Sequence, residues 1–157
     1  MKIRRGLILL AVICGLWGAG CDPVRANRSA QNVLDEDRLK IQTNAQLVID
    51  KVGKQLGVEL AYDEKSIEWV DGFINRNREG LDSHARHNLT HTLGAFLGET
   101  IVKTYVGQWT FDADRGWGVE IGDRMTVFPF VTTQDHFENG SEDSIAAFYK
   151  SIAPLME

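Results

Sequence analysis

The chain has 157 residues, of which 17 are lysine or arginine and 22 are aspartate or glutamate, so its formal net charge is −5. This excess of negative charge repels phosphate groups and argues against nucleic acid as a partner. The length is that of one ordinary domain, which is enough to bury a hydrophobic core.

Residues 1–20, MKIRRGLILLAVICGLWGAG, have the pattern of a secretory signal peptide. Lys2, Arg4 and Arg5 provide a positive start, an apolar run follows, and small residues stand before a cleavage site. The apolar run is too short to form a stable transmembrane helix. We therefore expect residues 1–20 to be removed, which takes away three positive charges and leaves a still more acidic chain.

Cys21 follows the small residues directly. This start resembles a bacterial lipoprotein signal, and the resemblance implies a diacylglycerol on the Cys21 thiol and attachment to the membrane through acyl chains. The alternative is a plain signal peptide with a cysteine there by chance. The other cysteine, Cys14, would leave with the signal peptide, so no intramolecular disulfide is expected. In a Gram-negative host, Asp22 resembles the residue that keeps lipoproteins on the periplasmic face of the inner membrane.

Residues 21–42 hold few apolar side chains among many charged and amide ones, and they predict a tether, with a frayed helix near residues 30–40. A single domain is predicted over residues 43–157. It begins with a helix over residues 44–56, because apolar residues recur there at helical spacing and Gly57 can end it.

A second helix is predicted from about Tyr62 to Gly80, where apolar residues again recur at helical spacing. A third is capped by Asp82 or Ser83 and extends to about Tyr105. One face of this third helix is strongly apolar and contains Leu89, Leu93, Phe96, Leu97 and Ile101. The opposite face begins with His84, His87 and His91 and continues with Gly94 and Gly98. Two glycines at this spacing allow close approach by another element.

After Gly107 the apolar period changes from helical to alternating, which predicts strands over residues 108–111, 117–121 and 125–131. Short turns join them, so an antiparallel meander is expected. Pro129 cannot donate a hydrogen bond to a sheet, so the end of the third strand is expected at an edge or a bulge.

Ser141 is predicted to cap a last helix, and Pro154 to end it. The apolar stripe of this helix contains Ile145, Phe148, Tyr149 and Ile152. The predicted order is ααα-βββ-α. The fold class is therefore α+β, with three to four helices packed on one face of a small three-stranded antiparallel meander.

From Tyr62 onward the chain carries the segments YDEKSIEWVDGFINRNR, LGAFLGETIV, GQWTF, GWGVEI, VFPF and FENGSEDSIAAFYKSI. Their order resembles that of a family of small bacterial domains of unknown function, over about residues 44–156. The resemblance implies an α+β domain and no particular activity, catalytic residue or cofactor. The three clustered histidines are not part of this pattern.

Three of the four histidines are clustered, at His84, His87 and His91. Imidazoles at the spacing of His87 and His91 can chelate zinc, nickel or copper, and His136 or Asp82 could supply a further ligand. The preferred interpretation is the solvated start of a helix, because the histidines oppose the leucine stripe. We therefore expect no bound metal and no cofactor.

Glu99 follows Gly98 within a strongly apolar segment. A half-buried carboxylate there could have a raised pKa and a catalytic role. The preferred interpretation is structural: a hydrogen bond or ion pair to an arginine or to the Trp109 indole would fix the sheet on the helix.

Four aromatic residues lie on the predicted strands: Trp109, Trp117, Phe128 and Phe130. They could line a groove for a ligand or peptide, although such residues more often form the core face of a sheet. Trp109, Trp117 and Glu99 are thus the candidate binding residues. The sequence has no nucleophile elbow, phosphate loop, Cys-x-x-Cys or His-Glu-x-x-His motif, which argues against an enzyme.

These patterns together predict a lipid-anchored protein of the cell envelope that binds another protein or a peptide and is not an enzyme. The alternative is a lipoprotein that binds a metal or a small ligand at the face of His84, His87 and His91. A hydrolase that uses Glu99 with a histidine is a third hypothesis.

Overall fold

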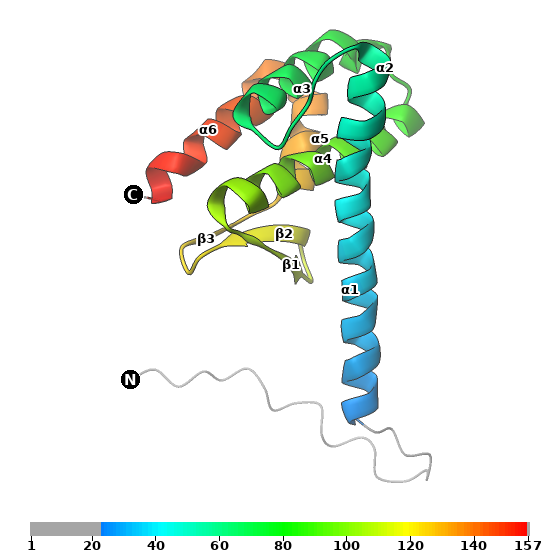
Figure 1. Ribbon diagram of the computed structural model, residues 1–157, viewed down its shortest axis with the longest axis vertical. Helices are drawn as coiled ribbons and strands as arrows, with labels where there is room; N and C mark the ends of the chain where they lie inside the picture. Colours follow the sequence, from blue (N-terminus) through cyan, green and yellow to red (C-terminus); the bar gives the residue numbers. More distant parts are fainter. Residues whose placement is uncertain (1–22, 157) are drawn as a thin grey trace. The chain divides into compact units, whose positions relative to one another are not determined.

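The computed structural model describes residues 23–156 (Figure 1). Helix α1 (Pro23–Leu47) is the first described element, and the described chain from Leu34 onward forms one compact unit. The predicted signal peptide, Cys21 and Asp22 lie outside the described residues. Among the described helices, none combines the length and apolar character that crossing a bilayer requires.

The segment predicted as a tether is helical from Pro23 onward, because it belongs to α1. Ile41 and Ala45 are buried in the core, and Val48 is buried in the π-helical turn that follows α1 (Val48–Gly53). Three apolar residues at helical spacing thus give this polar segment one narrow face that packs. A short helix, α2 (Lys54–Leu56), then ends at Gly57, whose φ is +65°.

Helices α3 (Glu64–Asn77) and α4 (Ser83–Tyr105) confirm two of the predicted helices. An aspartate caps each of them. Asp63 accepts a hydrogen bond from the Ser66 N–H at 2.8 Å, and Asp82 accepts one from the Ala85 N–H at 2.7 Å. These bonds satisfy N–H groups that have no partner within the helix.

Helix α4 is buried on two faces. Leu93, Phe96, Leu97 and Ile101 form the predicted core face. On the opposite face, a Cβ added at Gly94 would lie 2.7 Å from the Phe130 ring, and one added at Gly98 would lie 2.1 Å from the Trp109 ring. The predicted close approach at the two glycines is therefore confirmed.

Strands β1 (Gln108–Asp112), β2 (Gly116–Ile121) and β3 (Met125–Val127) form the predicted antiparallel meander. Trp109 lies opposite Val119, and Val119 lies opposite Val127. All three are buried, so they form the core face of the sheet.

The third strand ends earlier than predicted, at Val127, and Pro129 begins a helix that the sequence analysis missed, α5 (Pro129–Asn139). Proline suits the first position of a helix, where no backbone N–H is needed. The buried residues of α5 recur at helical spacing: Pro129, Thr133, His136 and Phe137. Two of these four are polar, so the spacing of the apolar residues alone does not indicate a helix.

A 3₁₀ turn (Gly140–Asp143) leads into the last helix, α6 (Ile145–Met156). Its cap is Ser144, whose hydroxyl accepts from the Ala147 N–H at 3.1 Å, and not Ser141 as predicted. Pro154 lies inside α6 and does not end it. The predicted apolar stripe is buried at Ile145, Tyr149 and Ile152.

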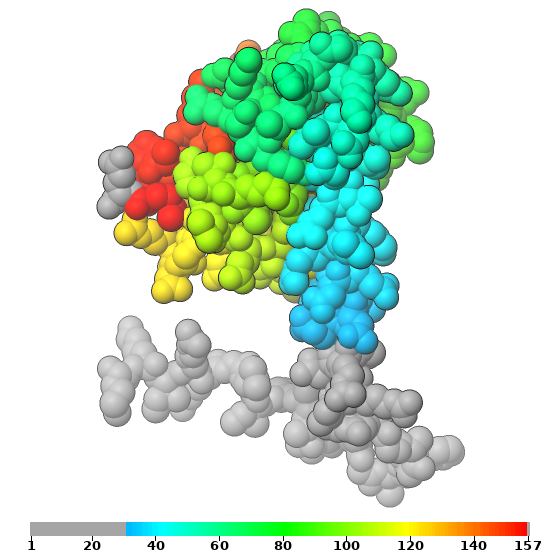
Figure 2. All heavy atoms as spheres, in the orientation of Figure 1, coloured from blue at the N-terminus to red at the C-terminus, as the bar shows by residue number. Residues whose placement is uncertain are grey.

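The domain is thus a mixed helix and sheet fold that is mostly helical, and it differs from the predicted order by α5 and by the start of α1. In Figure 1, α4 passes between the sheet and the pair formed by α3 and α6. In the space-filling view, the end of α1 and the turn after it, in cyan, lie directly against α4, in yellow-green (Figure 2).

Candidate functional site

A hollow with a volume of about 550 Å³ lies on the histidine-bearing side of α4. The N-terminal half of α4 lines it with Ser83, Arg86, His87, Thr90 and His91. The other side is formed by α5 and by the turn between β1 and β2, which contribute Phe130, Val131, Gln134, Glu138 and Arg115. We call this site the α4–α5 hollow. Its volume falls within the range of small-ligand sites.

The hollow results from an unequal approach of α5 to α4. At Gly94 and Gly98 the absence of side chains lets Phe130, Pro129 and the Trp109 ring lie against the α4 backbone. Toward the start of α4 the same face carries side chains, so the two helices cannot meet as closely there. The glycines on this face of α4 therefore allow close contact with α5, whereas two of the histidines on the same face border the hollow.

Arg86 lies on the wall of the hollow and uses little of its hydrogen-bonding capacity. Its Nη2 donates to the Arg78 carbonyl oxygen at 3.1 Å, and its buried Nε has no hydrogen-bond partner. A guanidinium has five N–H donors, and those of Nη1 and the second one of Nη2 have no partner among the described residues. Within residues 23–156, Arg86 also makes no ion pair.

Arg115 approaches the hollow from the β1–β2 turn. Its backbone N–H is bonded to the Asp112 carboxylate at 2.8 Å, which orders the turn, and its guanidinium lies 5.1 Å from the centre of the Phe128 ring. Stacking on an aromatic ring holds the guanidinium plane but leaves its N–H donors free for another acceptor. No ion pair of Arg115 occurs in the described part of the chain.

The clustered histidines are exposed, as the helical geometry predicted, and two of them border the hollow. The His87 and His91 rings are 4.6 Å apart, and the His91 ring is 5.8 Å from that of Phe130. Burial, with a smaller effect of His87, lowers the pKa of His91 below its ordinary value. His84 lies away from the hollow and is bonded to Asn88 at 3.1 Å.

The residues considered as additional metal ligands do not join the histidine pair. Asp82 caps α4, and His136 is fully buried with both ring nitrogens bonded elsewhere. In the part of the chain that the structure describes, no three His, Cys, Asp or Glu side chains are placed to hold a metal ion. A metal at the histidine pair would thus need its remaining ligands from water or a partner.

Glu99 is buried, with 4% of its surface exposed, and its Oε1 accepts a hydrogen bond from the Trp109 indole N–H at 2.7 Å. The Trp109 indole is one of the two partners that the structural interpretation named, and the bond joins α4 to the sheet. The burial of Tyr62, followed by the nearby Glu99 carboxylate, raises the pKa of Tyr62 to about 12. Glu99 does not line the α4–α5 hollow.

The four candidate aromatic residues do not form one groove. Trp109 is buried against Gly98, and Trp117 is half-buried in edge-to-face contact with the exposed Phe111, at 5.6 Å between ring centres. Phe128 lies beneath Arg115. Phe130 is on α5 and not on a strand, and only this ring lines the hollow.

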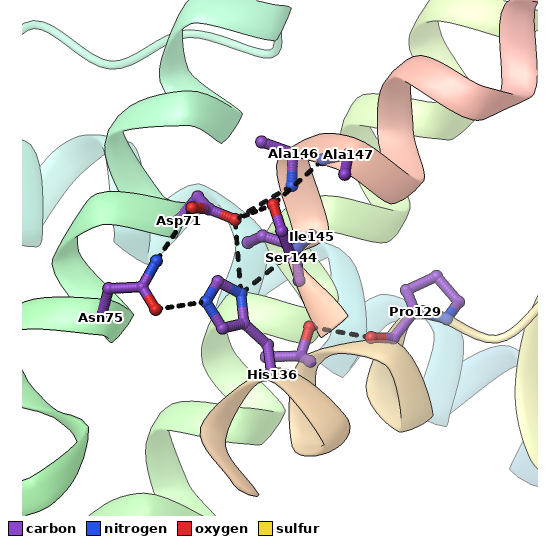
Figure 3. Close-up of polar contacts among 9 residues, drawn as sticks. Asp71, Asn75, Pro129, His136, Ser144, Ile145, Ala146 and Ala147 are labelled. Carbon is purple, nitrogen blue, oxygen red and sulfur yellow. Dashed lines mark hydrogen bonds and ion pairs between the residues drawn. The ribbon is translucent and has the colours of Figure 1, made fainter. Parts of the chain in front are cut away.

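A second polar cluster, the His136 cluster, joins α3, α5 and the start of α6 (Figure 3). The His136 Nδ1 accepts from the Ile145 N–H at 3.2 Å, so its Nε2 carries the proton and donates to the Asn75 Oδ1 at 3.1 Å. The imidazole is therefore neutral. Burial lowers the pKa of His136 and outweighs the opposing effect of Asp71, whose Oδ1 lies 3.4 Å from Nδ1.

Asp71 completes the His136 cluster. It accepts from the Ser144 hydroxyl at 2.6 Å, from the Ala146 N–H at 3.2 Å and from the Asn75 amide at 3.1 Å. The carboxylate lies at the N-terminus of α6, where it is also favoured by the helix dipole. Because the Ser144 hydroxyl is bonded to Asp71 and not to His136, the cluster does not have the arrangement of a nucleophile activated by a base.

The histidine face was predicted from the sequence, but Arg86 and Arg115 were not predicted to line a site. No role was predicted for Asp71. Arg86 lies between His84 and His87 in the sequence, so its position within the histidine segment could have indicated it. Arg115 gives no local signal, because only the fold brings its turn beside α4. No family model, curated protein or solved structure matches the chain.

Proposed function

We propose that this protein is a lipid-anchored binding protein of the bacterial envelope. Acyl chains at Cys21 hold it on the membrane, and its domain binds a protein or peptide partner at the α4–α5 hollow. The observation that carries the binding role is the hollow itself, about 550 Å³ in volume and bordered by two arginines that make no ion pair within residues 23–156. Charged donors without partners favour binding of an acceptor.

A photo-crosslinking amino acid placed in the hollow tests the binding role in the native envelope. Val131 lines the hollow and is 46% exposed, whereas Leu155 is 58% exposed and lies outside it. We expect a discrete crosslinked product from position 131 that position 155 does not give and that Arg115→Gln reduces. Equal products from both positions, or none from position 131, would contradict a partner at the hollow.

The lipid anchor is tested separately. Cys21→Ser should move the protein from the membrane fraction to the soluble fraction, because the acyl chains need the thiol. In a Gram-negative host, Asp22→Ser should move it from the inner to the outer membrane. A Cys21→Ser protein that still sediments with membranes would disprove the lipoprotein assignment.

A metal-binding lipoprotein is the second candidate, and one observation favours it. The His87 and His91 rings are 4.6 Å apart on consecutive turns at the rim of the hollow. Two imidazoles at this spacing can bind a zinc or nickel ion whose other ligands come from outside. Metal analysis of the untagged protein distinguishes the candidates, because only the second requires one ion per chain that His87→Gln removes.

A further inference from the structure

We infer that the α4–α5 hollow binds a carboxylate group, held between the guanidinium groups of Arg86 and Arg115, with an apolar neighbour of that carboxylate against Phe130 and Val131. This inference rests on the proposed binding role of the hollow and names the chemistry of its ligand. The carboxylate can belong to an acidic side chain of a peptide or to a free organic acid.

The protein positions both guanidinium groups, and neither has an anionic partner within residues 23–156. Arg86 is held by one hydrogen bond to the Arg78 carbonyl, and its buried Nε has no acceptor. Arg115 is held by its ordered turn and by the Phe128 ring. A planar fork of N–H donors matches the two oxygens of a carboxylate, and little side-chain freedom is lost when the fork is already held.

The charge of the hollow favours a carboxylate over a phosphate. Among the described residues, Glu138 is the only carboxylate that lines the hollow, and its Oε1 accepts from the Gln134 amide at 2.9 Å. The two arginines and the one glutamate of the lining sum to a single positive charge. A monoanion neutralises that charge, whereas a doubly charged phosphate would lie near Glu138 with its second charge uncompensated.

Two apolar side chains on α5 lie among the polar residues that line the hollow, and they favour an apolar group next to the carboxylate. Phe130 is half-buried, and Val131 is 46% exposed. Both lie on α5, whereas Arg86 lies on α4. An aliphatic or aromatic group beside the carboxylate would cover these side chains and remove their apolar surface from water.

NMR titration of the whole protein tests the ligand class with four defined probes. They are 3-phenylpropionate, the capped dipeptide acetyl-Phe-Glu-amide, its neutral analogue acetyl-Phe-Gln-amide, and phenyl phosphate. We expect saturable shifts of the Val131 methyl and Thr90 amide signals with one or both carboxylates, with a Kd of about 1 mM for ligands this small. The neutral analogue should bind about tenfold more weakly, since it loses the charge-assisted hydrogen bonds.

Arg115→Gln and Arg86→Gln should each weaken carboxylate binding about tenfold, which is the loss of one charge-assisted hydrogen bond. Arg115 lies in an exposed turn, so its variant keeps the test valid even if Arg86→Gln fails to fold. Arg76→Gln removes the same charge from an exposed position on α3 outside the hollow, and it should leave binding unchanged.

Tighter binding of 3-phenylpropionate would identify a free organic acid as the source of the carboxylate. Tighter binding of the acidic dipeptide would identify a peptide side chain. Equal binding of the neutral analogue, tighter binding of phenyl phosphate, no response to any probe, or an Arg115→Gln variant equal to the wild type would each overturn the inference. Crosslinking at position 131 would still judge the proposed function independently, because it does not depend on the chemistry of the probe.

Discussion

The α4–α5 hollow and the His136 cluster lie on different faces of α5 and differ in how their polar atoms are used. In the His136 cluster, each ring nitrogen of the imidazole is bonded, and Asp71 accepts three hydrogen bonds. In the hollow, Arg86 makes one side-chain hydrogen bond and Arg115 makes none within the described residues. Satisfied buried polar groups stabilise a fold, whereas positioned groups without partners remain available for a ligand.

The largest effect is expected from breaking the His136 cluster. His136→Leu removes the acceptor of the Ile145 N–H and the donor to Asn75, so two polar groups lose their partners. We expect the free energy of unfolding to fall by about 2–4 kcal/mol in urea denaturation. Arg115→Gln, in the hollow, should change it by less than about 0.5 kcal/mol. Equal losses from the two variants would show that the His136 cluster contributes no more to stability than the α4–α5 hollow does.

A smaller loss is expected at the buried bond between α4 and the sheet. Trp109→Phe keeps an aromatic ring but removes the N–H that Glu99 accepts, and the buried carboxylate then lacks this donor. We expect a loss of about 1–3 kcal/mol. Trp117→Phe is the matched control, because Trp117 is half-buried and makes no side-chain hydrogen bond among the described residues. If Trp109→Phe costs no more than this control, the Glu99 bond contributes nothing to stability.

A fall in pH should lower the free energy of unfolding of the wild-type protein through His136. Burial lowers the pKa of His136 below its ordinary value of 6.5. Between the lowered pKa and 6.5 the unfolded chain binds a proton that the folded chain does not. The free energy of unfolding should therefore decrease as the pH falls below 6.5, and it should be constant with respect to this group above that value.

Urea denaturation at about pH 5 and about pH 7.5 measures this decrease. The decrease should be smaller in His136→Gln, which cannot titrate. The pKa of His91 is also lowered, so the control variant His91→Gln should lose a part of the decrease as well. A wild-type protein whose stability rises toward pH 5 would contradict the buried neutral imidazole.

The smallest effect is expected from the exposed histidines. Replacement of His84, His87 and His91 together by Gln should change the free energy of unfolding by no more than about 0.5 kcal/mol per residue, because these rings are exposed. Metal analysis of the wild-type protein should find no stoichiometric zinc or nickel. One ion per chain, absent from the triple variant, would favour the metal-binding candidate.

Most elements with a strong local pattern were predicted. The approximate extents of α3 and α4, the cap of α4 and the alternation in β1 and β2 follow from spacing and capping chemistry. The cost of burying a carboxylate predicts a partner for Glu99, and the Trp109 indole was one of the two that were named. Helix α5 was missed because the segment around Pro129 has strand-forming residues, and because Thr133 and His136 occupy core positions. Proline is favoured both at the first position of a helix and at the edge of a sheet, so the sequence alone does not distinguish the two.

The sequence by itself determined the acidic charge, the two faces of α4 and the place where another element could approach its glycines. These are properties of neighbouring residues on one helix, and helical periodicity is enough to derive them. Only the tertiary structure decided which element approaches, because that contact joins α4 to α5 and to the sheet. It also decided that Arg115 and Arg86 line the same hollow and that His136 contacts Asp71 and Asn75. Such pairings depend on contacts between segments far apart in the chain, which no local pattern encodes.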